Sequence, residues 1–413
     1  MGANANCNRA EISLELPHLM KVSIIVGGRW HAFDLAKELQ QAGVLHRLIT
    51  TYPKFKTRQW SIPDEKVVSL PASLLLERLI HKIGKDHLVS KYQYFLHQTF
   101  AHLAAHYLKG SDVIHGWSGF SLPALKWAKE NGVPFVLERS SSHMLVQCQL
   151  LQKEYDRLGL TWAATHPKVV EQDLKEYNLA DRVAVPSLFV KRGFLDQGFN
   201  EERLIYNPFG TNLKSFFPGE KQDNTFRVVY AGALSVRKGV YYLVQAFQEA
   251  GIPNSELCLV GGASAETPRL LAQADERVKC IGHVPQSSLV KYYQNSSVFV
   301  MASIDEGMAM VQLQALACGL PLICTTNTGG EDLLRLSGEP TKLGGGIEEY
   351  PAGYLVPACD SRAISQCLKL LADDPKLLSS KREAALSIRD TDLGWETYAK
   401  RAIDSYKVIA LNS

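Results

Sequence analysis

The sequence predicts an α/β fold with two doubly wound parallel-sheet domains that face a cleft. Short apolar runs rich in β-branched residues alternate with segments of helical spacing along most of the chain. The alternation occurs in two series, and a segment rich in proline, glycine and asparagine separates them. Such alternation is typical of parallel sheets covered by helices on both faces. Ligands of such sheets bind at the carboxyl ends of the strands, so we expect the site between the domains.

The first series begins with the apolar run KVSIIVGG at residues 21–28, which predicts a strand. A helix is expected over residues 29–43, with Gly43 as its stop. The same order returns downstream, with strands expected at 111–117 and 133–139 and a helix over 121–132 between them.

The second series has the same order of elements. Strands are expected at 226–232, 256–262, 278–284, 297–303 and 320–326, and helices over 239–251 and 306–319. The segment between the series, residues 203–226, contains the charged tip GEKQDN and is the expected interdomain linker. We therefore expect one domain over residues 1–205 and a second over residues 206–390.

Composition argues against several classes of protein. The 413 residues fit roughly two to three domains. Hydrophobic content of 46% and charged content of 21% are those of a soluble globular protein. The 45 Lys and Arg against 42 Asp and Glu give a net charge of +3, which is too even for a dedicated nucleic-acid binder. The eight cysteines include no CxxC pair, so we expect reduced core thiols.

The expected location is cytoplasmic. Residues 1–20 contain no apolar run suited to a signal peptide, and no stretch approaches the roughly 18 apolar residues that cross a bilayer. Residues 52–60 interleave basic with aromatic side chains, and residues 74–88 follow with helical spacing. Basic residues beside aromatics suit an anionic membrane surface, so peripheral contact with the inner face of a membrane is one interpretation. An ordinary solvated loop and core helix is the other.

Two loops have the composition of phosphate-binding loops. In YAGALSVRKGVYYLV, residues 230–244, Gly232 stands at a strand end, and Arg237 and Lys238 come just before a helix. A cation beside exposed amides at a helix start suits a diphosphate. Two solvated charges on a surface loop are the alternative.

The second loop is SIDEGMAMVQ, residues 303–312. A helix is expected to begin near Gly307, with free N–H groups there that would take a phosphate oxygen. Glu306 would face the sugar, because a carboxylate repels a diphosphate. Gln314 stands eight positions later, about 12 Å away on an α-helix, which is close to the span of a sugar–diphosphate–ribose. A buried helix with one polar residue at each end is the alternative.

Together these loops resemble the C-terminal domain of glycosyltransferase family 4, the retaining nucleotide-sugar transferases with two Rossmann-like domains (the GT-B fold). The family pattern is a Glu, seven residues, a second Glu, a Gly-Leu-Pro strand start and a Gly-Gly loop. This chain has Glu306, Gln314, ACGLPLI and NTGGEDLL. Residues 180–218 resemble the family's domain junction, and residues 281–303 resemble the run before the Glu motif.

The resemblance implies a role for each residue of the site. The expected catalytic residues are Glu306 and His143, both near the donor sugar. The expected ligands of the donor diphosphate are Arg237, Lys238, Gly307, Met308 and Gly28. Gln314 would bind the ribose, and the backbone of His283 and Val284 would hold the base. The SSSH segment of which His143 is part follows an expected strand, so a structural histidine and a helix cap remain alternatives.

The sequence departs from the family pattern at two positions. Gln314 replaces the second Glu, and an amide oxygen accepts from a ribose hydroxyl without the charge that makes such bonds roughly twice as strong. Ala233 stands where many members carry an Arg, and Arg237 beside Lys238 is a candidate replacement for that charge.

No metal ion and no cofactor are expected. The DTD sequence from Asp390 to Asp392 is similar to the manganese-binding aspartates of other glycosyltransferases, but it precedes an expected helix and is favoured as its N-cap. In the family this last helix crosses back to the N-terminal domain, and residues 391–413 are expected to do so. Trp395 and Tyr398 fit as its aromatic anchors.

The resemblance thus implies a retaining, metal-independent enzyme that moves a hexose from a nucleoside diphosphate sugar to a hydroxyl of a glycan or lipid-linked acceptor. The first domain would be the acceptor side. For this family the favoured proposal is attack on the face of the leaving group, with the leaving phosphate accepting the proton of the acceptor. A nucleotide-sugar epimerase and a non-catalytic nucleotide-sugar-binding protein are the alternatives.

Overall fold

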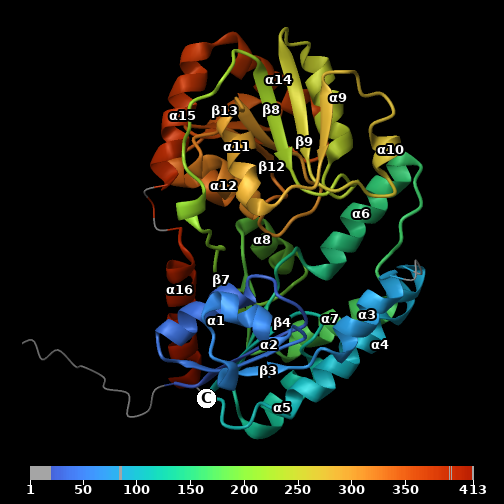
Figure 1. Cartoon of the computed structure of the whole chain (residues 1–413), viewed down its shortest axis with the longest axis vertical. Coiled ribbons are helices and arrows are strands. Elements are labelled where there is room, and N and C mark those ends of the chain that lie inside the picture. The colour runs from blue at the N-terminus through green and yellow to red at the C-terminus, as the bar shows by residue number, and fades with distance from the viewer. Residues whose placement is uncertain (1–19, 83–85, 390, 392, 412–413) are drawn as a thin grey trace, which may run out of the picture.

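The computed structural model describes residues 20–82, 86–389, 391 and 393–411. Two lobes are stacked along the long axis of the molecule, each built around one sheet (Figure 1). Asp390 and Asp392, expected at the N-cap of the last helix, lie outside the described residues. The predicted fold class is confirmed.

The first sheet is parallel throughout, in the order β3-β2-β1-β4-β5-β6-β7. Its strands are β1 (Val22–Val26), β2 (Leu45–Thr50), β3 (Val67–Ser69), β4 (Val113–Trp117), β5 (Phe135–Glu138), β6 (Arg182–Val185) and β7 (Leu204–Tyr206). Alternate side chains of β1 enter the two faces, because Ile24 packs in one buried cluster and Ile25 in the other. Burial on both faces explains the continuous apolar runs of the sequence.

The second sheet has the order β10-β9-β8-β11-β12-β15-β14-β13. Its strands are β8 (Phe226–Ala231), β9 (Ser255–Val260), β10 (Val278–Gly282), β11 (Val298–Met301), β12 (Leu322–Thr325), β13 (Thr341–Gly344), β14 (Ile347–Tyr350) and β15 (Gly353–Val356). Six strands are parallel, whereas β14 pairs antiparallel with both β13 and β15. This antiparallel edge was not predicted.

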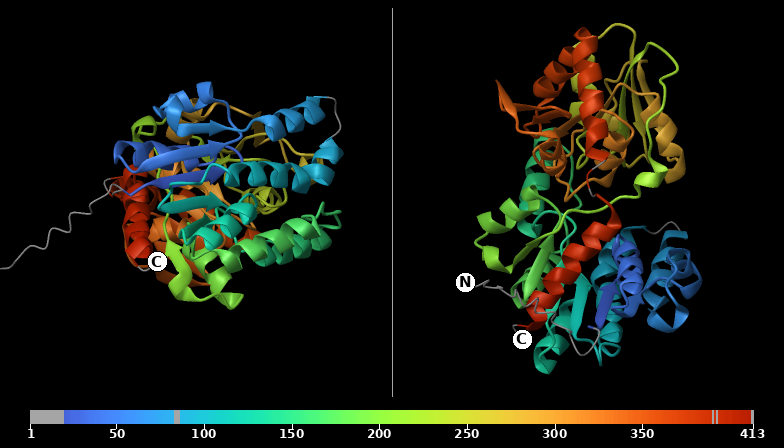
Figure 2. Two further views of the ribbon diagram at one scale, coloured as in Figure 1. Left: turned by 90° about the horizontal axis from the view of Figure 1, so that it is seen from below. Right: turned by 90° about the vertical axis from the view of Figure 1, so that its left-hand side faces the viewer.

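Helices cover both faces of each sheet (Figure 2). Those in the first lobe are α1 (Ala32–Gln41), α2 (Lys54–Thr57), α3 (Ala72–Lys82), α4 (Asp86–Ala105), α5 (Leu122–Asn131), α6 (Met144–Leu158), α7 (Pro167–Leu179) and α8 (Leu188–Asp196). Those further along the chain are α9 (Val240–Ala250), α10 (Thr267–Leu270), α11 (Leu289–Gln294), α12 (Met310–Ala317), α13 (Gly330–Leu334), α14 (Ser361–Asp373), α15 (Pro375–Arg389) and α16 (Trp395–Leu411).

Two helices connect the lobes. The last helix, α16, lies beside α1 of the first lobe (Figure 1), and the Tyr398 hydroxyl donates to Glu138 of β5 across 3.0 Å. Helix α6 rises toward the second lobe, where Glu154 accepts from the Tyr242 hydroxyl at 2.8 Å. The chain passes between the sheets after Tyr206 and before Phe226. The domain boundaries at residues 205 and 390 stay a prediction.

Candidate active site

Two adjoining cavities lie between the lobes, and Trp30, Ser140 and Glu306 line both of them. The larger has a volume of about 570 Å³ and the smaller about 310 Å³. Loops at the carboxyl ends of β1, β5 and β11 supply these shared residues. The cleft therefore lies where ligands of doubly wound sheets bind.

The glycine loop after β1 forms the first-lobe wall of the cleft. Gly28 has a φ of +147°, a backbone conformation that L side chains rarely adopt. A Cβ at Gly27 would stand 2.1 Å from a ring atom of Phe120. Neither glycine lines the cavities, but the turn they make places Arg29, Trp30 and His31 on the larger one.

The predicted phosphate cations lie opposite two carboxylates of the second loop. The Lys238 ammonium pairs with Glu306, and Arg237 Nε donates to Asp305 Oδ2 at 3.0 Å. Nη2 of Arg237 is also 3.8 Å from Glu306 Oε1. Burial by itself would lower the Arg237 pKa, but attraction to Glu306 and Asp305 outweighs burial and raises the pKa. Arg237 lines the smaller cavity, and because its pKa is raised, it keeps its full charge there.

Gly307 lies at a close approach of the two lobes. A Cβ at this position would stand 1.9 Å from the carbonyl oxygen of Ser140, so only glycine fits. Among the described residues, no group accepts from the N–H groups of Gly307 and Met308. Met308 also lines the larger cavity. Two free amides are thus available beside the cations.

The helix after this loop begins later than predicted. Helix α12 starts at Met310, not near Gly307, because the N–H of Glu306 donates to Asn327 and that of Ala309 donates to Thr328. Glu306 therefore lies in the loop, and the 12 Å helical separation expected between Glu306 and Gln314 does not apply. Both residues still line the larger cavity.

Gln314 has an environment that suits a ligand. Its residue surface is 3% exposed, it lines the larger cavity, and its buried Oε1 has no hydrogen-bond partner in the described part of the chain. Gln312, two positions earlier, has the opposite environment. Its Nε2 donates to Thr328 O at 2.9 Å, and its Oε1 accepts from the Thr328 hydroxyl at 3.1 Å. Gln312 is thus the core amide of this helix.

His143 lies away from the cavities. It is the N-cap of α6, where its Nδ1 accepts from the N–H of Leu145 at 3.3 Å, and its ring packs against Tyr177 and Phe194. Burial and the nearby charge of Arg139 lower the pKa of His143 to about 4. His143 lines neither cavity. The geometry favours the cap alternative over a contact with the donor sugar.

The predicted base-binding segment lies at the border of the cleft. His283 and Val284 follow β10 and do not line either cavity, whereas Gln286 and Ser287, shortly after them, line the larger one. The base-binding role of His283 and Val284 stays a prediction.

Sequence reasoning missed two buried charged residues of the site. Asp305 is fully buried and accepts from the Ser142 hydroxyl, from Gln147 Nε2 at 2.6 Å and from Arg237. Arg139 lines the smaller cavity and donates to Asp173 at 2.9 Å. The acidic pair in the loop after β11 was the only sequence signal for Asp305, and its first-lobe partners Ser142 and Gln147 are far away in the sequence.

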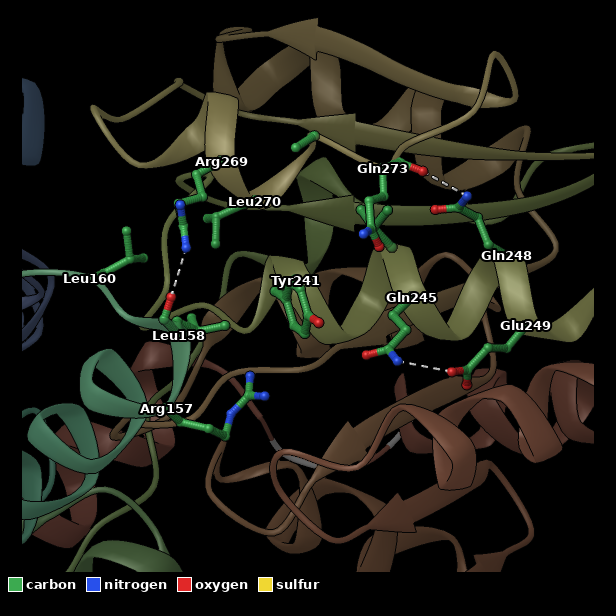
Figure 3. Close-up of a pocket in the computed structure, with 12 residues that line it drawn as sticks. Arg157, Leu158, Leu160, Tyr241, Gln245, Gln248, Glu249, Arg269, Leu270 and Gln273 are labelled. Carbon is green, nitrogen blue, oxygen red and sulfur yellow. Dashed lines mark hydrogen bonds between the residues drawn. The ribbon is translucent and has the colours of Figure 1, made fainter.

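A third cavity, of about 580 Å³, lies between the end of α6 and helices α9 and α10 (Figure 3). Its two cations are occupied within the protein, because Arg269 donates to the Leu158 carbonyl at 3.2 Å and Arg157 pairs with Glu154 at 2.8 Å. Among the described residues, no three or more His, Cys, Asp or Glu side chains form a group that could hold a metal ion.

Two facing α/β lobes, with cations and free amides at the strand ends, are typical of nucleotide-sugar transferases with the GT-B fold. Residues 225–374 match the family described as Glycosyl transferases group 1. The match assigns residues 225–374, the larger part of the second lobe, to this family, glycosyltransferase family 4, and the chain is a nucleotide-sugar-dependent hexosyltransferase. The predicted family and enzyme class are confirmed.

Relatives and solved structures agree with this assignment. A D-inositol 3-phosphate glycosyltransferase of Pseudarthrobacter chlorophenolicus is 27% identical over 319 residues, which cover 71% of this chain and 70% of that protein. A GDP-mannose-dependent monoacylated alpha-(1-6)-phosphatidylinositol monomannoside mannosyltransferase of Corynebacterium glutamicum is 23% identical over 330 residues, which cover 73% of this chain and 78% of that protein.

The fold is similar to that of a sucrose-phosphate synthase from Thermosynechococcus elongatus, with a TM-score of 0.68 and 21% identity over 95% of this chain and 100% of that chain. An Anabaena protein solved in complex with UDP-glucose has a TM-score of 0.63 and 15% identity, over 94% of this chain and 100% of that chain.

Proposed function

We propose that this transferase is retaining and metal-independent, and that it moves a hexose to a hydroxyl of a glycan or lipid-linked acceptor. The observation that carries the proposal is that Arg237, Lys238 and two free amides lie beside Glu306, which lines the larger cavity together with Gln314. The cations and amides suit the diphosphate, Glu306 suits the sugar, and Gln314 suits the ribose.

The donor diphosphate would lie against Arg237, Lys238 and the N–H groups of Gly307 and Met308. Breaking the anomeric C–O bond puts negative charge on the leaving diphosphate, and preorganised donors in a narrow cleft stabilise such charge best. No metal ion is needed for this task, since two cations already face the phosphates. Glu306 would leave its ion pairs with the cations and contact the donor sugar, and Gln314 Oε1 would accept from a ribose hydroxyl.

Exposed apolar side chains of the first lobe support peripheral contact with a membrane. Phe55 is 61% exposed between Lys54 and Lys56 on α2, and Leu75 is 60% exposed on α3. Apolar side chains beside lysines suit an anionic lipid surface. Among the described residues, no helix is both long and apolar enough to cross a membrane. The name of the Corynebacterium relative includes a phosphatidylinositol acceptor, which favours a lipid-linked acceptor here.

Incubation with a panel of UDP, GDP and ADP sugars tests the proposal, after a thermal-shift screen with the same panel has identified the base. We expect one donor to raise the melting temperature and to release its nucleoside diphosphate without added metal, also in the presence of a chelator. Epimerised donor would argue for an epimerase, and binding without turnover would argue for a sensor; either result would overturn the proposal. The relatives reported above are transferases, which favours transfer.

A further inference from the structure

His31 and Glu138 form a buried pair on the acceptor side of the cleft. His31 is the N-cap residue of α1, directly after the glycine loop, and is 5% exposed. It lines the larger cavity together with Glu306, and Glu138, at the end of β5, lines the smaller one. Among the residues that line these two cavities, His31 is the one imidazole.

Glu138 is held as a charged carboxylate. Its Oε1 is 3.3 Å from His31 Nε2, and its Oε2 contacts His115 Nε2 at 3.1 Å and accepts from the Tyr398 hydroxyl at 3.0 Å. Burial would raise the pKa of Glu138, but the two imidazoles outweigh burial and lower the pKa to about 2. The carboxylate is therefore ionised at neutral pH.

The two ring nitrogens of His31 differ in their surroundings. Nε2 lies 3.3 Å from Glu138 Oε1, and neither atom has a hydrogen-bond partner in the described part of the chain, so attraction to the carboxylate favours a hydrogen on Nε2. Within the described part of the chain no group bonds to Nδ1, which keeps a free lone pair. Phe209, with ring centroids 4.1 Å apart, and Trp395, with an interplanar angle of 7°, hold the imidazole in place.

We propose that His31 accepts the proton of the attacking acceptor hydroxyl and that Glu138 is its positioning residue. This inference rests on the proposed function. The acceptor oxygen forms a bond to the anomeric carbon, the bond between that carbon and the diphosphate oxygen breaks with its electron pair going to the diphosphate, and the hydroxyl proton goes to His31 Nδ1. The imidazolium so formed is stabilised by Glu138 and loses the proton to water after the products leave.

The charged and titratable groups around His31 come from four elements. Glu138 and His115 face it from the first sheet, Tyr398 faces it from α16, and Asp34 of α1 and Arg29 of the glycine loop act at longer range. Only a neutral imidazole can accept a proton, so transfer should fall as the solution is made acidic. A mechanism in which the leaving phosphate is the sole proton acceptor predicts no dependence on His31.

The test is His31→Gln in the full chain, which keeps a nitrogen near the position of Nε2 beside Glu138 but removes Nδ1. Release of nucleoside diphosphate from the donor selected by the panel is measured against pH, with water and with octyl glucoside and octyl mannoside as acceptors. We expect the rate of nucleoside diphosphate release to fall about 100-fold or more, and the acidic limb of the pH profile, where the wild-type rate declines at low pH, to disappear. The Kd of the nucleoside diphosphate should stay within about twofold of wild type. The matched control is His102→Gln, which replaces an exposed histidine on α4 and should change neither the release rate nor its pH profile.

Glu138→Gln keeps the shape of the carboxylate and should move or remove the acidic limb, which keeps the proposal testable if His31→Gln does not fold. A His31→Gln enzyme with wild-type rate and pH profile would overturn the proposal. Parallel loss of nucleotide binding and transfer would also overturn it, in favour of a structural anchor. Failure of wild type to release diphosphate from any donor would instead refute the proposed function.

Discussion

At the scale of single residues, two glutamines of α12 show how the same side chain is used in two ways. Gln312 is satisfied on both sides by Thr328, whereas the buried Oε1 of Gln314 is unpaired and faces the donor cavity. A buried acceptor without a partner costs free energy unless a ligand supplies the donor. A ribose hydroxyl would supply it.

Gln314→Glu should therefore strengthen nucleoside diphosphate binding, by about 1 kcal/mol, because a charged acceptor makes the stronger hydrogen bond. The matched change Gln312→Glu should lower the melting temperature by several degrees, because it puts a charge where Nε2 donates to Thr328 O. Calorimetric titration of both variants measures the change in nucleoside diphosphate affinity, and thermal melting measures the change in stability. A destabilised Gln314→Glu protein with no gain in affinity would refute the ribose assignment.

The assignment of Glu306 as a contact of the donor sugar depends on its negative charge. Glu306 neutralises Lys238 and lies 3.8 Å from Arg237, so it competes with a diphosphate for the same cations. Glu306→Gln should leave nucleoside diphosphate affinity equal or higher while the transfer rate falls about tenfold or more. Affinity and rate measured side by side separate the two effects. Equal loss of both would mean that Glu306 has a structural role only.

Residues such as His143 show where sequence reasoning reaches its limit. An imidazole after a strand has the same local pattern whether it caps a helix or contacts a sugar. Packing of Tyr177 and Phe194 around the ring decides the matter, and these residues are 34 and 51 positions away in the sequence. Arg237, Lys238 and Gly307 could be predicted because loop position and chemistry are local.

At the scale of elements, strands and helices with strong periodicity were predicted, whereas the first residue of helix α12 and the edge strands of the second sheet were not. Helix α12 begins at Met310 because the preceding amides donate to the loop of residues 327–328, which periodicity does not record. The antiparallel strands β13 and β14 extend the second sheet beyond the repeated strand–helix units. Helix α13 makes a further contact between lobes, because Asp332 on it accepts from the Tyr206 hydroxyl of β7 at 2.6 Å.

Asp332 gives this contact a pH dependence. Burial raises its pKa from 3.8 to about 6, against the hydrogen bonds from Tyr206 and Leu188. The folded chain thus keeps a proton that the unfolded chain has lost, so this group makes stability fall as pH rises from about 4 to about 6. Asp332→Asn should raise the melting temperature at pH 7 by a few degrees, with a difference that shrinks toward pH 4.

Both hydrogen bonds reach Oδ1, which asparagine retains, while Oδ2 has no partner in the described part of the chain. Asp373→Asn, an exposed carboxylate on α14, is the control and should show no such trend. A melting temperature of Asp332→Asn that tracks wild type from pH 4 to pH 7 would contradict the assignment.

At the scale of the whole molecule, the sequence predicted two sheets, a cleft and a last helix that crosses back to the first lobe, but not the polar contacts between the lobes. The repeated strand–helix order is local and therefore visible in one sequence. Asp305, which pairs with Arg237 in the second lobe, accepts from Ser142 and Gln147 of the first lobe, and each of these two residues is more than 150 positions away from it in the sequence. Such contacts depend on the relative placement of domains, which periodicity does not encode.

The central claim is that Lys238, with Arg237, holds the donor diphosphate in this cleft. Its most direct test is the Kd of the selected nucleoside diphosphate for wild type, Lys238→Ala and the control Lys369→Ala, which removes an exposed lysine of α14. Loss of a charge-assisted contact of about 1.5–3 kcal/mol predicts a Kd about tenfold or more higher for Lys238→Ala, and an unchanged Kd for the control. A folded Lys238→Ala protein that binds the nucleoside diphosphate as tightly as wild type would contradict the claim.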